Sequence, residues 1–117
     1  MASIVIRLDP GQLKNPDADL RYEIPDLIAE RSGGLVEANG YDYELDGNAM
    51  QIYLQTSDTG SAIQLIIQVL ENEQLHDNDL SRGTQIGVNE SDSPAATEFT
   101  IVYPPGSSGV LLAPRMA

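Results

Sequence analysis

Two runs of alternating apolar and polar residues flank Asp46-Gly47-Asn48, and this arrangement most constrains the fold. Alternation with period two is typical of a strand that buries one face, and Asp, Gly and Asn are the residues of tight hairpin turns. We therefore predict a β-hairpin that joins a strand over 35–45 to a strand beginning at Met50. A change of phase near Asn39-Gly40 indicates a β-bulge in the first strand.

The alternation also predicts which side chains of the hairpin point the same way. Tyr41 and Tyr43 share a face with Met50 and Ile52 for either placement of a two-residue loop. We expect this face to line the core, with the two tyrosine hydroxyls reaching water at its edge. Tyr53 falls on the opposite face.

Three further segments have strand character, and two have helical character. Residues 4–8, 84–89 and 99–103 are short apolar runs with partial alternation. A helix is predicted from Asn15-Pro16-Asp17, with Asn15 as N-cap, to Gly33-Gly34. Pro25 interrupts that pattern, so the helix either kinks or restarts there. A second helix over 57–75 has Asp58 or Ser61 as its cap and a wide apolar arc.

The order of these elements is β-α-β-β-α-β-β. It predicts an α+β domain of the ferredoxin-like, split βαβ type, an antiparallel sheet with two helices on one face. We assign residues 1–103 to this single domain and 104–117 to a Pro/Gly/Ser linker with an apolar tail. The tail segment Val110–Leu112 needs a contact to hold it, and a second copy of the chain is one candidate.

Charge and cysteine content exclude several classes of protein. The 117 residues hold 18 acidic and 6 basic side chains, for a net charge of -12, with no cysteine and one histidine. Disulfide scaffolds, thiolate zinc sites and cysteine nucleophiles are therefore excluded. A surface of this charge repels the phosphate backbone of nucleic acids. The sequence also has no stretch long enough to span a membrane, and we expect a cytoplasmic protein.

Two acidic segments resemble sites of catalysis or metal binding. Asp42-x-Glu44-x-Asp46-Gly47 begins like a calcium loop, but its twelfth position is Tyr53 where a bidentate glutamate is required. The segment from His76 to Asp79 holds the one imidazole beside carboxylates, a candidate general base or half of a metal site. Turn chemistry after a helix explains the same residues. We therefore predict no catalytic residue, no metal site and no cofactor.

The sheet face opposite the two helices is the predicted contact surface. In an antiparallel sheet with helices on one side, the other side meets water or a partner. Its mixture of one tyrosine with amides and acids is closer to the composition of an interface than to that of a catalytic pocket. An ordinary solvated face is the alternative. The predicted partner-binding residues are Asp42, Glu44, Gln51, Tyr53 and Gln55.

These observations favour a non-enzymatic interaction protein. A net charge of -12 steers association toward a strongly basic partner, such as a nuclease with a phosphate-binding surface. In size and charge the chain resembles small acidic immunity proteins of bacterial toxin systems, which implies an inhibitor of a toxin nuclease. The alternative is a small-molecule or metal-binding ferredoxin-like domain that forms a homodimer.

Overall fold

The computed structural model describes residues 1–15, 19–44, 49–75, 78–91 and 97–113. Five of its strands fall where the sequence predicts them, whereas the short strands in the 74–79 region and the last strand were not predicted. The elements in chain order are β1 (Ala2–Leu8), the 3₁₀ turn η1 (Pro10–Gln12), α1 (Leu20–Ser32), β2 (Val36–Tyr43), β3 (Met50–Thr56), α2 (Thr59–Asn72), β4 (Gln74–Leu75), β5 (Asn78–Asp79), β6 (Thr84–Asn89), β7 (Glu98–Tyr103) and β8 (Val110–Leu112).

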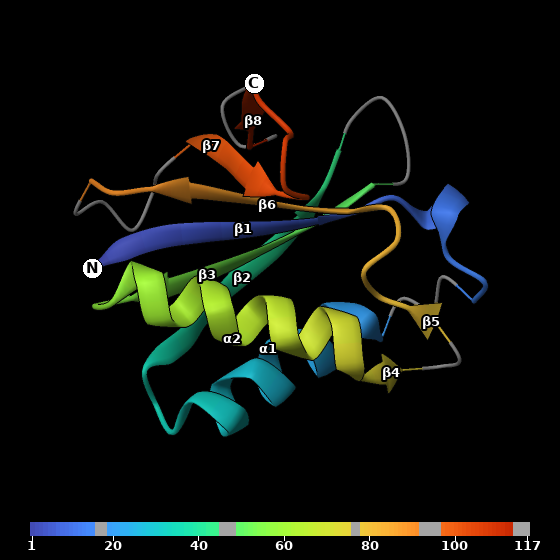
Figure 1. Cartoon of the computed structure of the whole chain (residues 1–117), viewed down its shortest axis with the longest axis horizontal. Helices are drawn as coiled ribbons and strands as arrows, with labels where there is room; N and C mark the ends of the chain where they lie inside the picture. The colour runs from blue at the N-terminus through green and yellow to red at the C-terminus, as the bar shows by residue number, and fades with distance from the viewer. Residues whose placement is uncertain (16–18, 45–48, 76–77, 92–96, 114–117) are drawn as a thin grey trace.

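The main sheet has six strands in the order β2-β3-β1-β6-β7-β8, and every neighbouring pair is antiparallel. Strands β4 and β5 form a separate two-stranded ribbon. Both helices lie on one side of the sheet, below it in Figure 1, as predicted. The chain is therefore an α+β protein. The helices and the facing side chains of β1, β2, β3 and β6 enclose the main core.

The predicted hairpin is confirmed. Strands β2 and β3 pair with Tyr41 opposite Ile52 and Tyr43 opposite Met50, so these side chains share the helix side of the sheet. The register shifts between Ala38 and Tyr41, and Gly40 adopts a φ of 89° within this bulge. A positive φ is readily reached by glycine, which explains its place there. The predicted turn residues 46–48 lie outside the described residues.

The first helix begins later than predicted. Its N-cap position is Asp19, and Pro16 and Asp17 lie outside the described residues. Asn15 is not the cap. Its backbone N–H instead donates to Asn78 Oδ1 at 2.7 Å, and its carbonyl accepts from Asn78 Nδ2 at 2.6 Å. The buried amide of Asn78 thus ties the segment before α1 to β5, in place of the predicted cap.

Pro25 lies inside a single helix, so the predicted restart at this residue is wrong. Proline removes one backbone hydrogen bond, here the one to the carbonyl of Arg21. The ring is buried beside Ile24 and Ile28, which keeps it on the core side of α1. We infer that this burial compensates for the lost bond. The helix ends at Ser32, next to the predicted end at Gly33-Gly34, and Gly33 caps it in the left-handed conformation with a φ of 63°.

The second helix is capped by Asp58, one of the two predicted candidates. Its carboxylate accepts from the Ser61 backbone N–H at 3.3 Å and from the Ser61 hydroxyl at 2.9 Å. The wide apolar arc also fits its packing. Ala62, Ile66 and Leu70 are buried in the main core, and partly buried isoleucines lie beside them.

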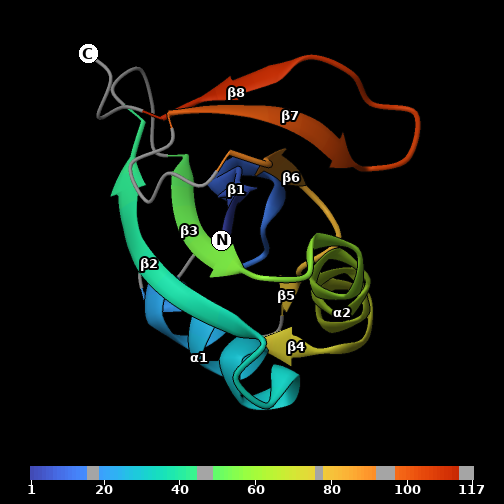
Figure 2. The same ribbon diagram turned by 90° about the vertical axis from the view of Figure 1, so that its left-hand side faces the viewer.

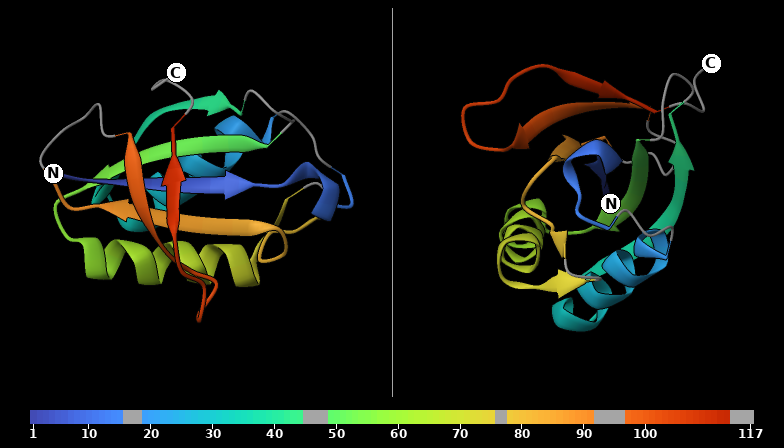
Figure 3. Two further views of the ribbon diagram at one scale, coloured as in Figure 1. Left: turned by 90° about the horizontal axis from the view of Figure 1, so that it is seen from above. Right: turned by 90° about the vertical axis from the view of Figure 1, so that its right-hand side faces the viewer.

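The sheet face opposite the helices is covered by the chain itself. The β7–β8 hairpin arches over this face in Figure 2 and crosses above β1 in the left view of Figure 3. Phe99 and Tyr53 stack there with ring centroids 6.2 Å apart. Because a Cβ on Gly87 would come within 2.7 Å of Phe99 Cβ, only glycine allows so close an approach. The second core consists of Val5, Tyr53, Phe99, Leu111 and Ala113, with Ile101 packed against it.

The apolar tail segment packs within its own chain. Strand β8 pairs with β7, and the Ala113 N–H donates to the Thr97 carbonyl at 2.8 Å. The contact that Val110–Leu112 required is therefore provided by β7. The boundary at residue 103 stays a prediction, and residues 114–117 lie outside the described residues.

We predict that Phe99→Ala lowers the free energy of unfolding by about 3–5 kcal/mol, because Phe99 is the largest of the fully buried side chains in the described residues and belongs to the core between hairpin and sheet. Urea unfolding followed by circular dichroism measures this loss. Val102→Ala is the matched control, since Val102 lies in the same strand but is exposed, and it should cost no more than about 1 kcal/mol. Equal losses for both variants would contradict the second core.

Candidate interaction surface

The five predicted contact residues lie on β2 and β3 or, for Glu44, directly after β2, on the expected side of the sheet, but two of them are not accessible. Gln51 is 0% exposed and Tyr53 is 3% exposed. The expectation that this face meets water or a partner is therefore wrong at both positions, because the β7–β8 hairpin covers them. Asp42, Glu44 and Gln55 are partly exposed. Their binding of a partner stays a prediction.

Three of these residues belong to one hydrogen-bond network that joins strands. Arg7 donates from Nε and Nη2 to the two carboxylate oxygens of Glu44, at 2.7 and 3.0 Å. Gln51 Nε2 donates to Glu44 at 2.8 Å and to the Leu112 carbonyl at 3.1 Å. The Tyr53 hydroxyl donates to Gln51 Oε1 at 2.9 Å. The network thus connects β1, β2, β3 and β8, which is a structural role.

The ion pair in this network sets the ionisation of its members. The hydrogen bond from Arg7 is the largest influence on Glu44 and lowers the pKa of its carboxyl group, and partial burial opposes it. The same bond raises the pKa of the Arg7 guanidinium. Both groups are therefore held in their charged forms near neutral pH.

We predict that this pair stabilises the fold in a pH-dependent way. Because the pKa of Glu44 is lower in the folded chain, its contribution is present above the unfolded pKa of about 4.3 and is lost as pH falls through the folded value. Glu44→Gln should cost about 1 kcal/mol at pH 7, and the cost should be smaller at pH 3. Urea unfolding at both pH values measures it.

Arg7→Met supplies the control for this prediction. In the Arg7→Met background the Glu44→Gln substitution should change the pH dependence of the free energy of unfolding much less, because the hydrogen bond from Arg7 is the largest influence on the pKa of Glu44. An effect of Glu44→Gln on this pH dependence that is undiminished without Arg7 would contradict the role given to the pair.

The segment weighed as a metal site or general base is described only in part. His76 and Asp77 lie outside the described residues. Asp79 accepts hydrogen bonds from the backbone and hydroxyl of Ser81, at 3.1 and 2.6 Å, as expected of a turn. Within the part of the chain that the structure describes, no group of three or more His, Cys, Asp or Glu side chains is placed to hold a metal ion.

An exposed cluster of three tyrosines around one arginine lies where α1 meets the edge strand β2. We call Arg21, Tyr22, Tyr41 and Tyr43 the tyrosine patch. The Arg21 guanidinium lies 4.7 Å from the ring centroid of Tyr22 and 5.1 Å from that of Tyr41. It also donates to the Tyr43 hydroxyl at 3.0 Å. The Tyr22 and Tyr43 rings each meet Tyr41 edge to face, with centroids 5.7 and 6.1 Å apart.

The exposure of this patch differs from the sequence prediction. Tyr22, Tyr41 and Tyr43 are 48%, 39% and 37% exposed. Tyr41 and Tyr43 do face the helix side, but β2 is the last strand of the sheet, so they lie at the rim of the helix layer. We expected the rings to be buried and only the hydroxyls to reach water. The alternation pattern correctly predicted which side of the sheet Tyr41 and Tyr43 face, but it did not predict that their rings are exposed.

Hydrogen bonds within the patch shift the pKa values of its members. The bond to Tyr43 raises the pKa of the Arg21 guanidinium above its ordinary value. The hydroxyl contact with Tyr41, followed by the charge of Arg21, lowers the pKa of Tyr22, and the same contact raises that of Tyr41. Arg21 therefore stays a cation held over aromatic rings.

The composition of the tyrosine patch is typical of a binding hot spot. Tyrosine and arginine are enriched among interface residues whose removal costs the most affinity. Rings that already contact one another and an arginine lose little conformational entropy when a partner covers them. The patch can offer ring faces to cations and hydroxyls to polar groups.

Comparison with protein families, with curated proteins and with solved structures found no match for this chain. Among the described residues, no helix is both long enough and apolar enough to cross a membrane.

Proposed function

We propose that this chain is a non-enzymatic, acidic binding protein whose partner is a basic protein. The observation that carries the proposal is the exposed tyrosine patch on a chain with a net charge of -12. Exposed aromatic clusters of this kind are typical of binding surfaces, and the excess of acidic groups favours a partner of opposite charge.

The charge acts at two ranges in this proposal. At long range, the negative potential of the whole chain accelerates encounters with a basic surface, most strongly at low ionic strength. At short range, Asp42 lies between Tyr41 and Tyr43 in β2 and adds negative charge at the same edge of the sheet. Lysine and arginine side chains of a partner would meet the ring faces on the helix side of this edge strand and the Asp42 carboxylate on its other side.

The partner that we propose is a nuclease, and the function is its inhibition, as in immunity proteins of toxin systems. A nuclease must carry a basic surface to bind phosphate. An acidic protein that covers this surface competes with the substrate for it. The size and charge of the chain, which resemble those of such immunity proteins, support this choice.

We also propose the ferredoxin-like assignment for the body of the fold. Support comes from the order β2-β3-β1-β6 within the sheet and from the positions of α1 after β1 and of α2 after β3. The β7–β8 hairpin is then an addition that covers the sheet face which that arrangement leaves free.

Binding to a panel of basic toxin nucleases tests the proposal. Calorimetric titration, with a basic protein lacking nuclease activity as control, should identify a nuclease that is bound more tightly than the control and is inhibited on binding. Affinity should fall as salt rises. Tyr41→Ala should raise Kd by about 30-fold, the loss expected at the centre of an interface.

The variants Tyr22→Phe and Tyr41→Ala, together with their melting temperatures, distinguish a loss of the binding surface from a loss of the fold. Tyr22→Phe keeps the ring and should change Kd by less than about threefold, because ring burial supplies most of the affinity. The melting temperature of each variant establishes that it is folded. Equal affinity for all basic proteins, binding to none, or an unchanged Kd for folded Tyr41→Ala would refute the proposal.

A further inference from the structure

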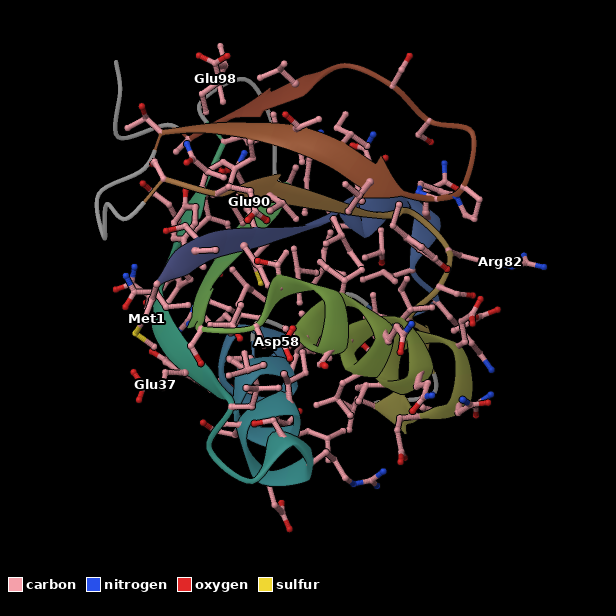
Figure 4. The ribbon with its side chains drawn as sticks, turned by 60° about the vertical axis from the view of Figure 1, so that its left-hand side comes forward. Met1, Glu37, Asp58, Arg82, Glu90 and Glu98 are labelled. Carbon is pink, nitrogen blue, oxygen red and sulfur yellow. The ribbon has the colours of Figure 1, made fainter. Side chains whose placement is uncertain are left out.

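A groove lies between the first turns of α2 and the strands β6 and β7. Its volume is about 810 Å³. Figure 4 shows Glu90 between β7, which carries Glu98, and the start of α2, which is marked by Asp58. The groove arises because α2 covers β6 but leaves the helix side of β7 open. It is lined by Thr59, Gly60, Ile63, Gln64, Val88, Asn89, Glu90, Glu98, Thr100 and Val102.

The groove continues onto the outer face of the β7–β8 hairpin. Phe99 and Leu111 pair across the hairpin and point into the second core, so the neighbouring pairs point away from it. This outer hairpin face carries Val102, Val110 and Leu112, which are 42%, 49% and 57% exposed. Apart from Met1, every exposed large hydrophobic side chain in the described ranges lies here or in the tyrosine patch.

The rim of this surface is acidic. Glu90 and Glu98 line the groove and are exposed, and none of the described residues that line it is a lysine or an arginine. An apolar floor with a charged rim is the usual anatomy of a protein interface. A second copy of the chain would bring the same two carboxylates and a net charge of -12, so repulsion disfavours self-association here.

We infer that the groove and the outer hairpin face bind a segment of the basic partner in which apolar residues alternate with lysine or arginine. The apolar side chains contact Ile63 and Val102, and the cationic side chains pair with Glu90 and Glu98. This inference rests on the proposed function and adds a second contact surface. The tyrosine patch is at the β2 end of the strand order, whereas this surface is at the β7–β8 end.

An eight-residue peptide of alternating valine and lysine is the probe that tests the inference. Its control alternates threonine and lysine, with the same charge but without the apolar groups. Nuclear magnetic resonance titration of the isotope-labelled chain at 0.15 M salt should show the valine peptide shifting signals of Ile63, Val88 and Val102. The threonine peptide should bind at least about tenfold more weakly.

Two pairs of charge variants distinguish binding at this site from electrostatic attraction of the peptide to the net charge of the whole chain. Glu90→Gln with Glu98→Gln should weaken binding of the valine peptide by about tenfold. Glu30→Gln with Glu71→Gln makes the same change in net charge at the last turns of α1 and α2, and should weaken it by less than about threefold. Val102→Thr should weaken binding without altering its salt dependence, and melting curves establish that each variant is folded.

The results discriminate between this inference and the proposed function. Equal weakening by the two charge pairs, or signal shifts confined to the tyrosine patch, would overturn the groove as a site. If nuclease binding still depends on Tyr41 in that event, the groove inference alone fails. Absence of both peptide binding and nuclease binding would refute the two together.

Discussion

The contact of the β7–β8 hairpin with the sheet determines which surfaces of this protein are exposed. Phe99 lies against Gly87 and Val5 of the sheet and stacks on Tyr53, and Leu111 closes the same core. Once this contact forms, a sheet with helices on one side only becomes a sheet covered on both sides. The amide of Gln51 then lies close enough to β8 to donate to the Leu112 carbonyl. The polar network around Arg7 and Glu44 depends on this packing.

Most of the fold could be predicted from the sequence because it depends on local patterns. Alternation in residues 41–45 and 50–55 predicts the hairpin, and the phase change at Asn39-Gly40 predicts its bulge. The cover over the sheet could not be predicted in this way. Strand β8 has three residues, and it follows a Pro-Pro-Gly-Ser-Ser-Gly stretch whose composition is that of a linker. The packing of this hairpin on Val5 and Tyr53, which are distant from it in the sequence, has no local signal.

In the candidate site, too, the sequence predicts which side of the sheet a side chain faces but does not predict how deeply that side chain is buried. Period-two alternation correctly placed Tyr41 and Tyr43 on the helix side and Tyr53 on the other. Burial, however, depends on what lies above a side chain. Tyr53 is covered by Phe99, whereas Tyr41 lies beyond the helix layer at the edge of the sheet. Two of the predicted contact residues, Gln51 and Tyr53, are therefore buried, and the exposure of the rings of Tyr41 and Tyr43 was missed.

Both proposed surfaces lie where the helix layer ends. Two helices enclose the helix side of β2, β3, β1 and β6, so within the described ranges no element covers the apolar side chains at the rim near Tyr41 or those beyond it on β7 and β8. Exposed patches of this kind promote self-association in a neutral protein. A net charge of -12 opposes contact between copies while it attracts cations. Under the proposed function, the acidity of the chain thus selects the partner for these surfaces, because it disfavours contact between identical copies and favours contact with a basic protein.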